Sequence, residues 1–166
     1  GKSNFKTKSE FKFKSKFKFK FGCGVKIIDN HGKYCILTSG PQLVGFCSAA
    51  TDVLSEKYRL KLDVFSISTL KNIDAEFVRE LFDNYSIIFV IEENINSGGL
   101  FDEINETASK INFVIGKYPA RKYNRLRLYH HSVNDFTFST LNPLGLYEHF
   151  QLDCDGIVNF IKMILQ

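Results

Sequence analysis

The chain has 166 residues, enough for one globular domain that buries about 70% of its unfolded surface, and its hydrophobic content of 44% is ordinary for such a domain. It has no run of about 18 apolar residues, which would predict a transmembrane helix. Its first residues also lack the apolar core of a secretory signal. We therefore expect a protein without a membrane span, in the cytoplasm or another reducing intracellular compartment.

The four cysteines show no pattern of a metal or redox site. Cys23, Cys35, Cys47 and Cys154 form no CxxC pair, and no histidine stands at ligand spacing from them. Such cysteines remain free thiols in a reducing compartment. The sequence therefore predicts no metal ligands and no disulfide.

The net charge of +4 is distributed unevenly. Residues 1–22 contain eight lysines and one glutamate, a net charge of +7, whereas the rest has 14 basic and 17 acidic side chains, a net charge of −3. Residues 1–16 are a low-complexity Lys/Phe leader, and residues 17–166 are the predicted domain. The leader is most simply a solvated segment. The alternatives are an RNA-binding arm and a segment that binds anionic surfaces. Because the leader lacks arginine and a folded recognition module, nucleic acid is not the expected partner.

The first half of the domain alternates strands and a helix. The sequence predicts a strand from Val25 to Asp29, a polar turn from Asn30 to Lys33, and a strand from Tyr34 to Thr38. Pro41 suits the first position of a helix, where its missing N–H costs nothing. Apolar residues then recur at helical spacing as far as Lys57.

The alternation continues further along the chain. Predicted strands are Leu62 to Ser68, Ile87 to Ile91 and Asn112 to Ile115, and a helix begins after Asp74. Helical spacing returns between the last two of these strands. The basic stretch from Lys122 to His131 is an exposed edge strand or a loop, and the final helix starts at Asp153.

This order predicts an α/β fold, a three-layer α/β/α sandwich with right-handed crossovers. We expect a mixed sheet of about five strands, mostly parallel. The turn at residues 30–33 should introduce one antiparallel strand.

The stretch IIFVIEENINSGG, residues 87–99, carries the main candidate site. Glu92 and Glu93 end a buried strand, and ligands or partners meet parallel sheets at the carboxyl ends of their strands. Adjacent strand residues point to opposite faces, so the two glutamates cannot easily bind one ligand. A role in fixing the following loop, or in an interface, is the preferred interpretation.

Gly98 and Gly99 stand immediately before a predicted helix. Their backbone N–H groups could bind an anion, but they form neither GxGxxG nor a P-loop with its lysine. A tight, closely packed turn is the preferred interpretation.

His130 and His131 are the natural candidates for a general base, yet no nucleophile elbow GxSxG accompanies them. The residues alone therefore predict no catalytic and no cofactor-binding group.

Four segments occur in order along the chain: Phe19 to Gly40, Val64 to Asp74, Val90 to Phe101 with its EE and GGL, and Gln151 to Ile157. This series resembles the carboxyl-terminal domain of transketolase-type thiamine diphosphate enzymes, a group that includes transketolase, 1-deoxyxylulose-5-phosphate synthase and the β-subunits of 2-oxo acid dehydrogenases. The resemblance covers about nine tenths of the chain and leaves out about the first sixteen residues.

The resemblance implies that thiamine diphosphate and magnesium bind to other domains of the parent enzyme. This chain would be a supporting domain of a two-carbon ketol or acyl transferase, inactive alone, packing against other domains or subunits and forming a homo-oligomer. Glu92, Glu93, Gly98 and Gly99 would be motif or interface residues. The alternative is a free-standing binding module for a small anion or nucleotide at the strand carboxyl ends.

Overall fold

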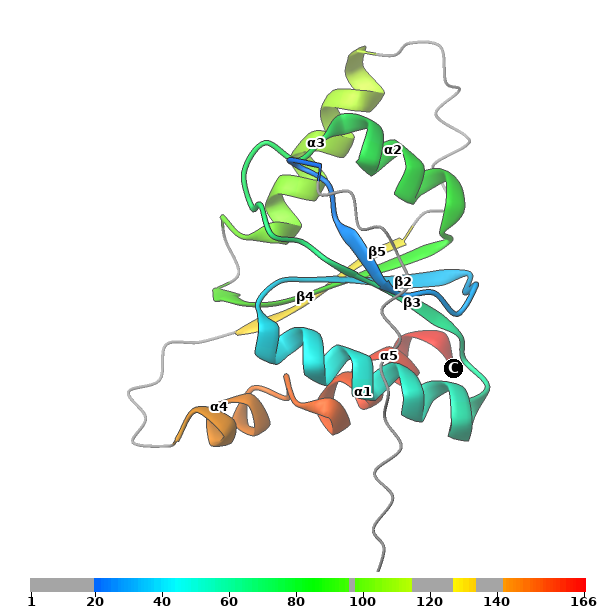
Figure 1. Cartoon of the computed structure of the whole chain (residues 1–166), viewed down its shortest axis with the longest axis vertical. Coiled ribbons are helices and arrows are strands. Elements are labelled where there is room, and N and C mark those ends of the chain that lie inside the picture. The colour runs from blue at the N-terminus through cyan, green and yellow to red at the C-terminus, as the bar shows by residue number, and fades with distance from the viewer. Residues whose placement is uncertain (1–19, 96–97, 115–126, 134–141) are drawn as a thin grey trace, which may run out of the picture.

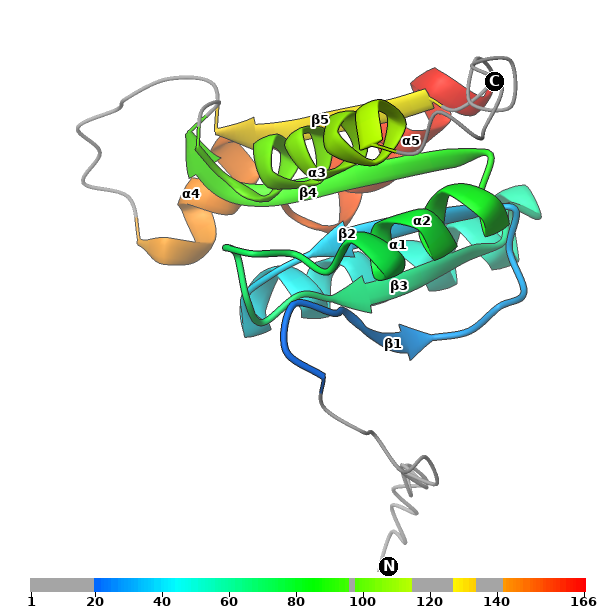
Figure 2. The ribbon, with the colours of Figure 1, turned by 90° about the horizontal axis from the view of Figure 1, so that it is seen from above.

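A computed structural model of the chain describes residues 20–95, 98–114, 127–133 and 142–166. The described part is a three-layer α/β/α sandwich (Figures 1 and 2). Helices α2 (Ala75–Asn84) and α3 (Leu100–Val114) cover one face of the sheet. Helices α1 (Pro41–Tyr58), α4 (Pro143–His149) and α5 (Cys154–Leu165) lie on the other. The predicted fold class is confirmed, whereas the Lys/Phe leader lies outside the described residues.

The sheet has five strands in the order β1-β3-β2-β4-β5. They are β1 (Val25–Ile28), β2 (Tyr34–Thr38), β3 (Leu62–Ser66), β4 (Ile87–Ile95) and β5 (Arg127–Val133). The pairs β2–β3, β2–β4 and β4–β5 are parallel, and β1 is antiparallel to β3. Two strands that follow each other in sequence, β3 and β4, thus flank the central β2, as in a doubly wound sheet.

The single antiparallel strand is present, but its neighbour differs from the one that the turn at residues 30–33 suggested. β1 pairs with β3 rather than with β2, because β2 already has β3 and β4 on its two sides. The turn is instead anchored on β3 itself, where the backbone N–H groups of Asn30 and Gly32 donate to the Asp63 carboxylate at 2.9 and 3.1 Å. A Cβ on Gly32 would collide with the Lys61 carbonyl.

Three helices begin where the sequence predicts. Pro41 is the first residue of α1. The side chain of Asp74 accepts a hydrogen bond from Phe77 N at the start of α2, and that of Asp153 accepts one from Gly156 N at the start of α5. Such side-chain caps satisfy N–H groups that have no partner within the helix.

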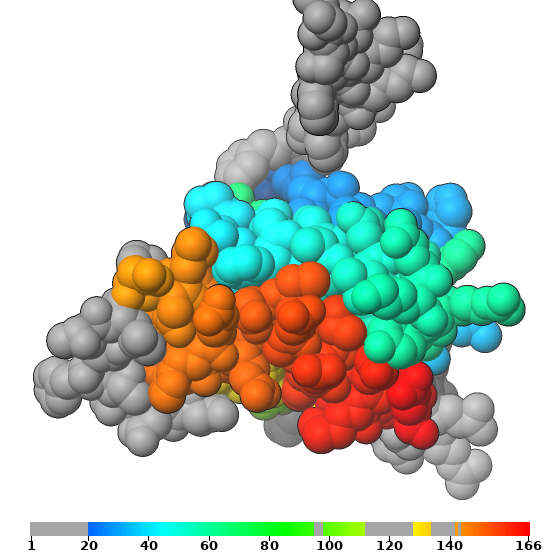
Figure 3. Space-filling view, turned by 90° about the horizontal axis from the view of Figure 1, so that it is seen from below, coloured from blue at the N-terminus to red at the C-terminus, as the bar shows by residue number. Residues whose placement is uncertain are grey.

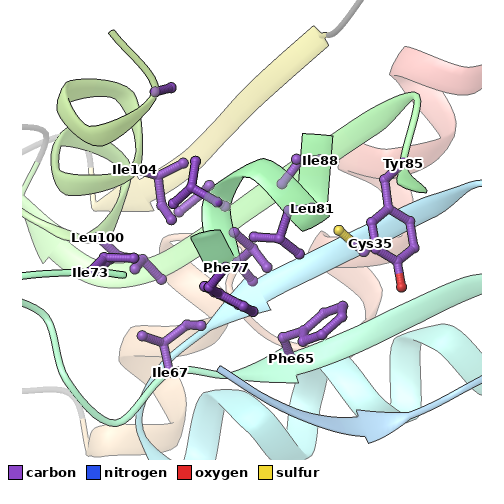
Figure 4. Packing of buried hydrophobic residues seen from close by; sticks show 14 of the residues in the cluster. Cys35, Phe65, Ile67, Ile73, Phe77, Leu81, Tyr85, Ile88, Leu100 and Ile104 are labelled. Carbon is purple, nitrogen blue, oxygen red and sulfur yellow. The ribbon is translucent and has the colours of Figure 1, made fainter. Parts of the chain in front are cut away.

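Two apolar clusters fix the layers. The cluster under α2 and α3 joins them to the sheet, and Figure 4 shows Phe65, Phe77, Leu81 and Tyr85 converging in it. The second cluster lies between the sheet and helices α1 and α5, around Ile36, Leu54, Phe89, Ile157 and Ile161. Strands buried on both faces explain the long apolar run before Glu92.

Two predictions need correction. The strand from Asn112 to Ile115 is wrong: α3 continues to Val114, because the apolar spacing that leads to the buried Ile111 is helical throughout, and Ile115 lies outside the described residues. Helix α4 was not predicted, although Asn142 followed by Pro143 is an ordinary helix start.

Within the described part of the chain, no helix has the length and apolar character needed to cross a membrane.

Candidate functional site

The carboxyl ends of β2 and β4 form the switch point of the sheet. The chain leaves β2 toward α1 on one face and leaves β4 toward α3 on the opposite face (Figure 1). Ligand sites of open α/β sheets lie at such a point. Both glutamates of the EE pair lie here. They belong to β4 itself, which extends to Ile95, beyond the predicted end at Ile91.

Glu92 points to the α3 side and is buried, with 1% of its surface exposed. Its Oε2 accepts a hydrogen bond from Leu100 N at 2.7 Å, and its Oε1 accepts one from Phe101 N at 3.3 Å. These are the first backbone N–H groups of α3, whose positive dipole end favours a carboxylate. Glu92 therefore caps the helix that follows it and fixes the intervening turn.

Gly99 gives the Glu92 carboxylate its space. A Cβ at position 99 would overlap both carboxylate oxygens of Glu92, so any larger residue must displace this group. Gly98 differs: its backbone has φ +77°, which favours glycine, but a Cβ there would meet nothing within 4 Å. The two glycines thus serve different purposes, close packing at Gly99 and a left-handed turn at Gly98.

His130 of β5 completes the Glu92 cluster. Its Nε2 lies 2.6 Å from Glu92 Oε1, and its ring stacks on Phe101 with centroids 4.4 Å apart. A carboxylate can only accept hydrogen bonds, so Nε2 carries the proton in this contact. The contact ties β5 to both β4 and α3.

Glu93 points to the other face, as strand alternation requires. Its Oε1 accepts a hydrogen bond from the Tyr147 hydroxyl of α4 at 2.6 Å. Burial, and then the nearby Glu93 carboxylate, raise the pKa of Tyr147 to about 12, so the phenol stays protonated. Glu93 itself is exposed, and its Oε1 would be 3.5 Å from a Cβ on Gly40 at the start of α1.

His131 follows Glu93 to the same face. Its Nε2 lies 2.8 Å from the Gln151 carbonyl, and its ring stacks on Phe160 of α5 with centroids 4.5 Å apart. Burial lowers the pKa of His131, against the opposing effect of the Gln151 carbonyl. The structure therefore separates the two histidines, just as it separates the two glutamates.

A third carboxylate, Asp63, lies buried at the amino end of β3. Besides the two N–H groups of the 30–33 turn, it accepts hydrogen bonds from the Tyr85 hydroxyl at 2.6 Å and from Lys26 Nζ at 3.0 Å. Burial opposes ionisation, but hydrogen bonds from Tyr85, Gly32 and Lys26 outweigh it and lower the pKa of Asp63. All its acceptor sites have partners, so this group holds β1 and the turn in place.

Sequence reasoning missed Asp63 and Tyr147. A single acidic residue inside a doubly covered strand requires buried partners, and this signal would have indicated the Asp63 cluster. Tyr147 becomes identifiable only once α4 is recognised. The four cysteines are free, and no group of three or more His, Cys, Asp or Glu side chains in the described residues could hold a metal ion.

The alternative of an anion or nucleotide module is not favoured. Glu92 already occupies the first N–H groups of α3, which a phosphate would need. The geometry defines instead a doubly wound α/β/α domain whose glycine turn is filled by its own carboxylate.

Comparison with known proteins identifies the family of this domain. Residues 24–157 match the family described as the transketolase C-terminal domain, and the chain belongs to it. A search of curated proteins finds no match.

Two solved structures share the fold. A split-gene transketolase, described as an inactive β4 tetramer, superposes with a TM-score of 0.68 at 21% identity, over 89% of this chain and 43% of that one. A transketolase from Campylobacter jejuni gives a TM-score of 0.55 at 15% identity, over 86% of this chain and 18% of that one. The chain therefore spans less than half the length of either transketolase.

Proposed function

We propose that this chain serves as the packing domain of a thiamine diphosphate-dependent enzyme of transketolase type, which transfers a two-carbon ketol or an acyl group. The match of residues 24–157 to the transketolase C-terminal domain family carries the proposal. Since the chain corresponds to 43% and 18% of two transketolases, the remaining parts are expected on other domains or subunits.

Thiamine diphosphate and magnesium are assigned to those other parts. The buried carboxylate next to the glycine turn does not fit a magnesium site, because Leu100 N, Phe101 N and His130 Nε2 already contact its oxygens. No catalytic step is therefore assigned to residues of this chain. Its contribution is to present an edge of the sheet, with the turn at Gly98 exposed for contacts with another domain or a sister subunit.

A cofactor-loading experiment tests this assignment. The purified chain is supplied with magnesium and thiamine diphosphate and assayed for ketol transfer from a ketose phosphate, while calorimetry measures binding of the cofactor. We expect neither turnover nor binding. Turnover near 1 s⁻¹, in the usual range of enzymes, would contradict the proposal.

Two further measurements test the proposed packing role. The coding sequence upstream of Gly1, or of a neighbouring gene, should specify a domain that binds the aminopyrimidine ring. Sedimentation equilibrium of the chain over the micromolar range should reveal a homo-oligomer. A strictly monomeric chain would assign the packing role to contacts between domains instead of contacts between identical subunits.

A further inference from the structure

A pocket lies between α4 and the ends of β4 and β5. Its volume is about 230 Å³. The walls are mostly apolar, and a carboxylate and a phenol stand among them; the lining residues are Glu93, Val133, Leu146, Tyr147, Phe150 and Leu152. Sites for small molecules have this composition, an apolar wall with a few convergent polar groups.

Short contacts hold the walls of the pocket in position. Tyr147 packs edge-on against Phe46 of α1, with ring centroids 5.1 Å apart, and donates its hydroxyl to Glu93. Leu152 N donates to the Tyr147 carbonyl at 2.8 Å, and the Leu152 side chain is buried. Figure 3 shows α4 lying against the outer layer formed by α1 and α5. The pocket is therefore formed before a ligand arrives.

The charge of the pocket selects the class of ligand. Among the described lining residues, Glu93 is the single carboxylate, and none carries a cationic side chain. Its hydrogen-bond donor is a neutral phenol, and within the described residues no ion pair of Glu93 occurs. A carboxylate has about four acceptor positions, so others remain for a ligand. The same charge lies beside the start of α1, where it would repel an anion.

We propose that this pocket binds a small organic ammonium ion, a protonated amine on a short aromatic or aliphatic group. The ammonium group donates to the Glu93 carboxylate, and the apolar group lies against Leu146, Phe150 and Leu152. The pocket is smaller than the roughly 300 Å³ at the lower end of drug-sized sites, which limits the ligand to about one ring with a short chain. This binding activity goes beyond the packing role and is independent of it.

The test uses three probes of similar shape and different charge on the unaltered full chain. They are 2-phenylethylammonium, the neutral 2-phenylethanol and the anionic 3-phenylpropionate, each titrated while NMR follows the amide signals of Glu93, Leu146 and Leu152. We expect saturable shifts with the ammonium ion and at least about tenfold weaker binding of the other two, the size of one lost charge-assisted contact. Equal binding of all three probes, or no saturable shift with the cation, would overturn the proposal.

Variants locate the site. Glu93→Gln should weaken binding of the ammonium ion about tenfold without affecting the neutral probe, whereas Leu146→Trp should fill the pocket and abolish binding of both. Glu106→Gln, at an exposed carboxylate on α3 that pairs with Lys110, removes the same charge at a distance and should change nothing. If Glu106→Gln weakened binding as much as Glu93→Gln, the effect would be one of net charge, and the site would be refuted. The probe series on the unaltered chain decides the matter even where a variant fails to fold.

Discussion

At the carboxyl end of β4, each face of the sheet carries one glutamate and one histidine, but the surroundings of these residues differ between the two faces. On the α3 side, Glu92 and His130 contact each other and the Glu92 carboxylate is buried at a helix start. On the α4 side, Glu93 and His131 belong to separate contacts and the carboxylate is exposed. Strand alternation sends each member of the two adjacent pairs to a different face.

The difference shows how a repeated residue acquires two roles. A carboxylate that accepts two helix N–H groups and a histidine is part of the fold, and its removal leaves buried donors without partners. Replacing an exposed carboxylate that accepts a hydrogen bond from one phenol lowers the stability of the fold only slightly. The comparison predicts that variants of Glu92 alter stability, whereas variants of Glu93 alter binding.

The largest effect is expected for Gly99→Ala. The added Cβ must displace the Glu92 carboxylate, which costs overpacking strain and the two hydrogen bonds to α3, about 3 kcal/mol in total. Urea unfolding followed by circular dichroism measures the loss. Gly98→Ala is the matched control: its Cβ has space, so only the left-handed backbone opposes it, at about 1 kcal/mol. Equal losses would show that backbone conformation, rather than contact with Glu92, governs this turn.

The next effect separates the glutamates directly. Glu92→Gln should lower the free energy of unfolding by about 2 kcal/mol, because the amide replaces one acceptor oxygen with a donor where only donors face it. Glu93→Gln should change it by less than about 0.5 kcal/mol, as is usual for exposed positions. Urea midpoints of both variants under one condition give the comparison. A larger loss for Glu93→Gln would reverse the roles assigned to the two faces.

A smaller, pH-dependent effect on stability is expected from His131. Since burial lowers the pKa of His131 in the folded chain, the unfolded chain binds more protons just below the ordinary histidine value of 6.5. His131 therefore makes stability fall as the pH drops through the range from 6.5 down to its folded pKa. His131→Phe, which keeps an aromatic ring beside Phe160, should flatten the pH dependence of urea midpoints between about pH 5 and 7.

If His131→Phe gave the same slope of stability against pH as the unaltered chain, burial of His131 would not be the source of the acid sensitivity.

Much of the fold could be predicted from local signals. Pro41, Asp74 and Asp153 mark helix starts through chemistry that operates within one turn, and β4 is apolar up to Glu92 because both its faces are covered there. The partner of β1 could not be read in this way. Strand order depends on which strands compete for the central position, which is a property of the whole sheet.

The candidate site was predictable only in part. The divergence of Glu92 and Glu93 follows from alternation, and the close packing of Gly99 was the preferred interpretation of the glycine pair. Sequence could not reveal that Glu92 itself fills the space beside Gly99, nor that Tyr147 reaches Glu93 from a helix 54 positions away. Such contacts are fixed by tertiary packing, which produces no periodic pattern in the amino-acid sequence.

A small effect on stability is expected for Tyr147→Phe. The substitution removes the hydroxyl that donates to Glu93 and keeps the ring that packs against Phe46. Because Glu93 is exposed, water replaces the lost donor, and the free energy of unfolding should fall by only about 0.5 kcal/mol. Phe46→Ala is the contrasting variant, since it removes the apolar contact instead and should cost more. Urea unfolding of both variants tests whether the hydroxyl or the ring fixes α4. A loss above about 1.5 kcal/mol for Tyr147→Phe would mean that the Glu93 contact is as structural as the Glu92 cap, and the contrast between the two faces would disappear.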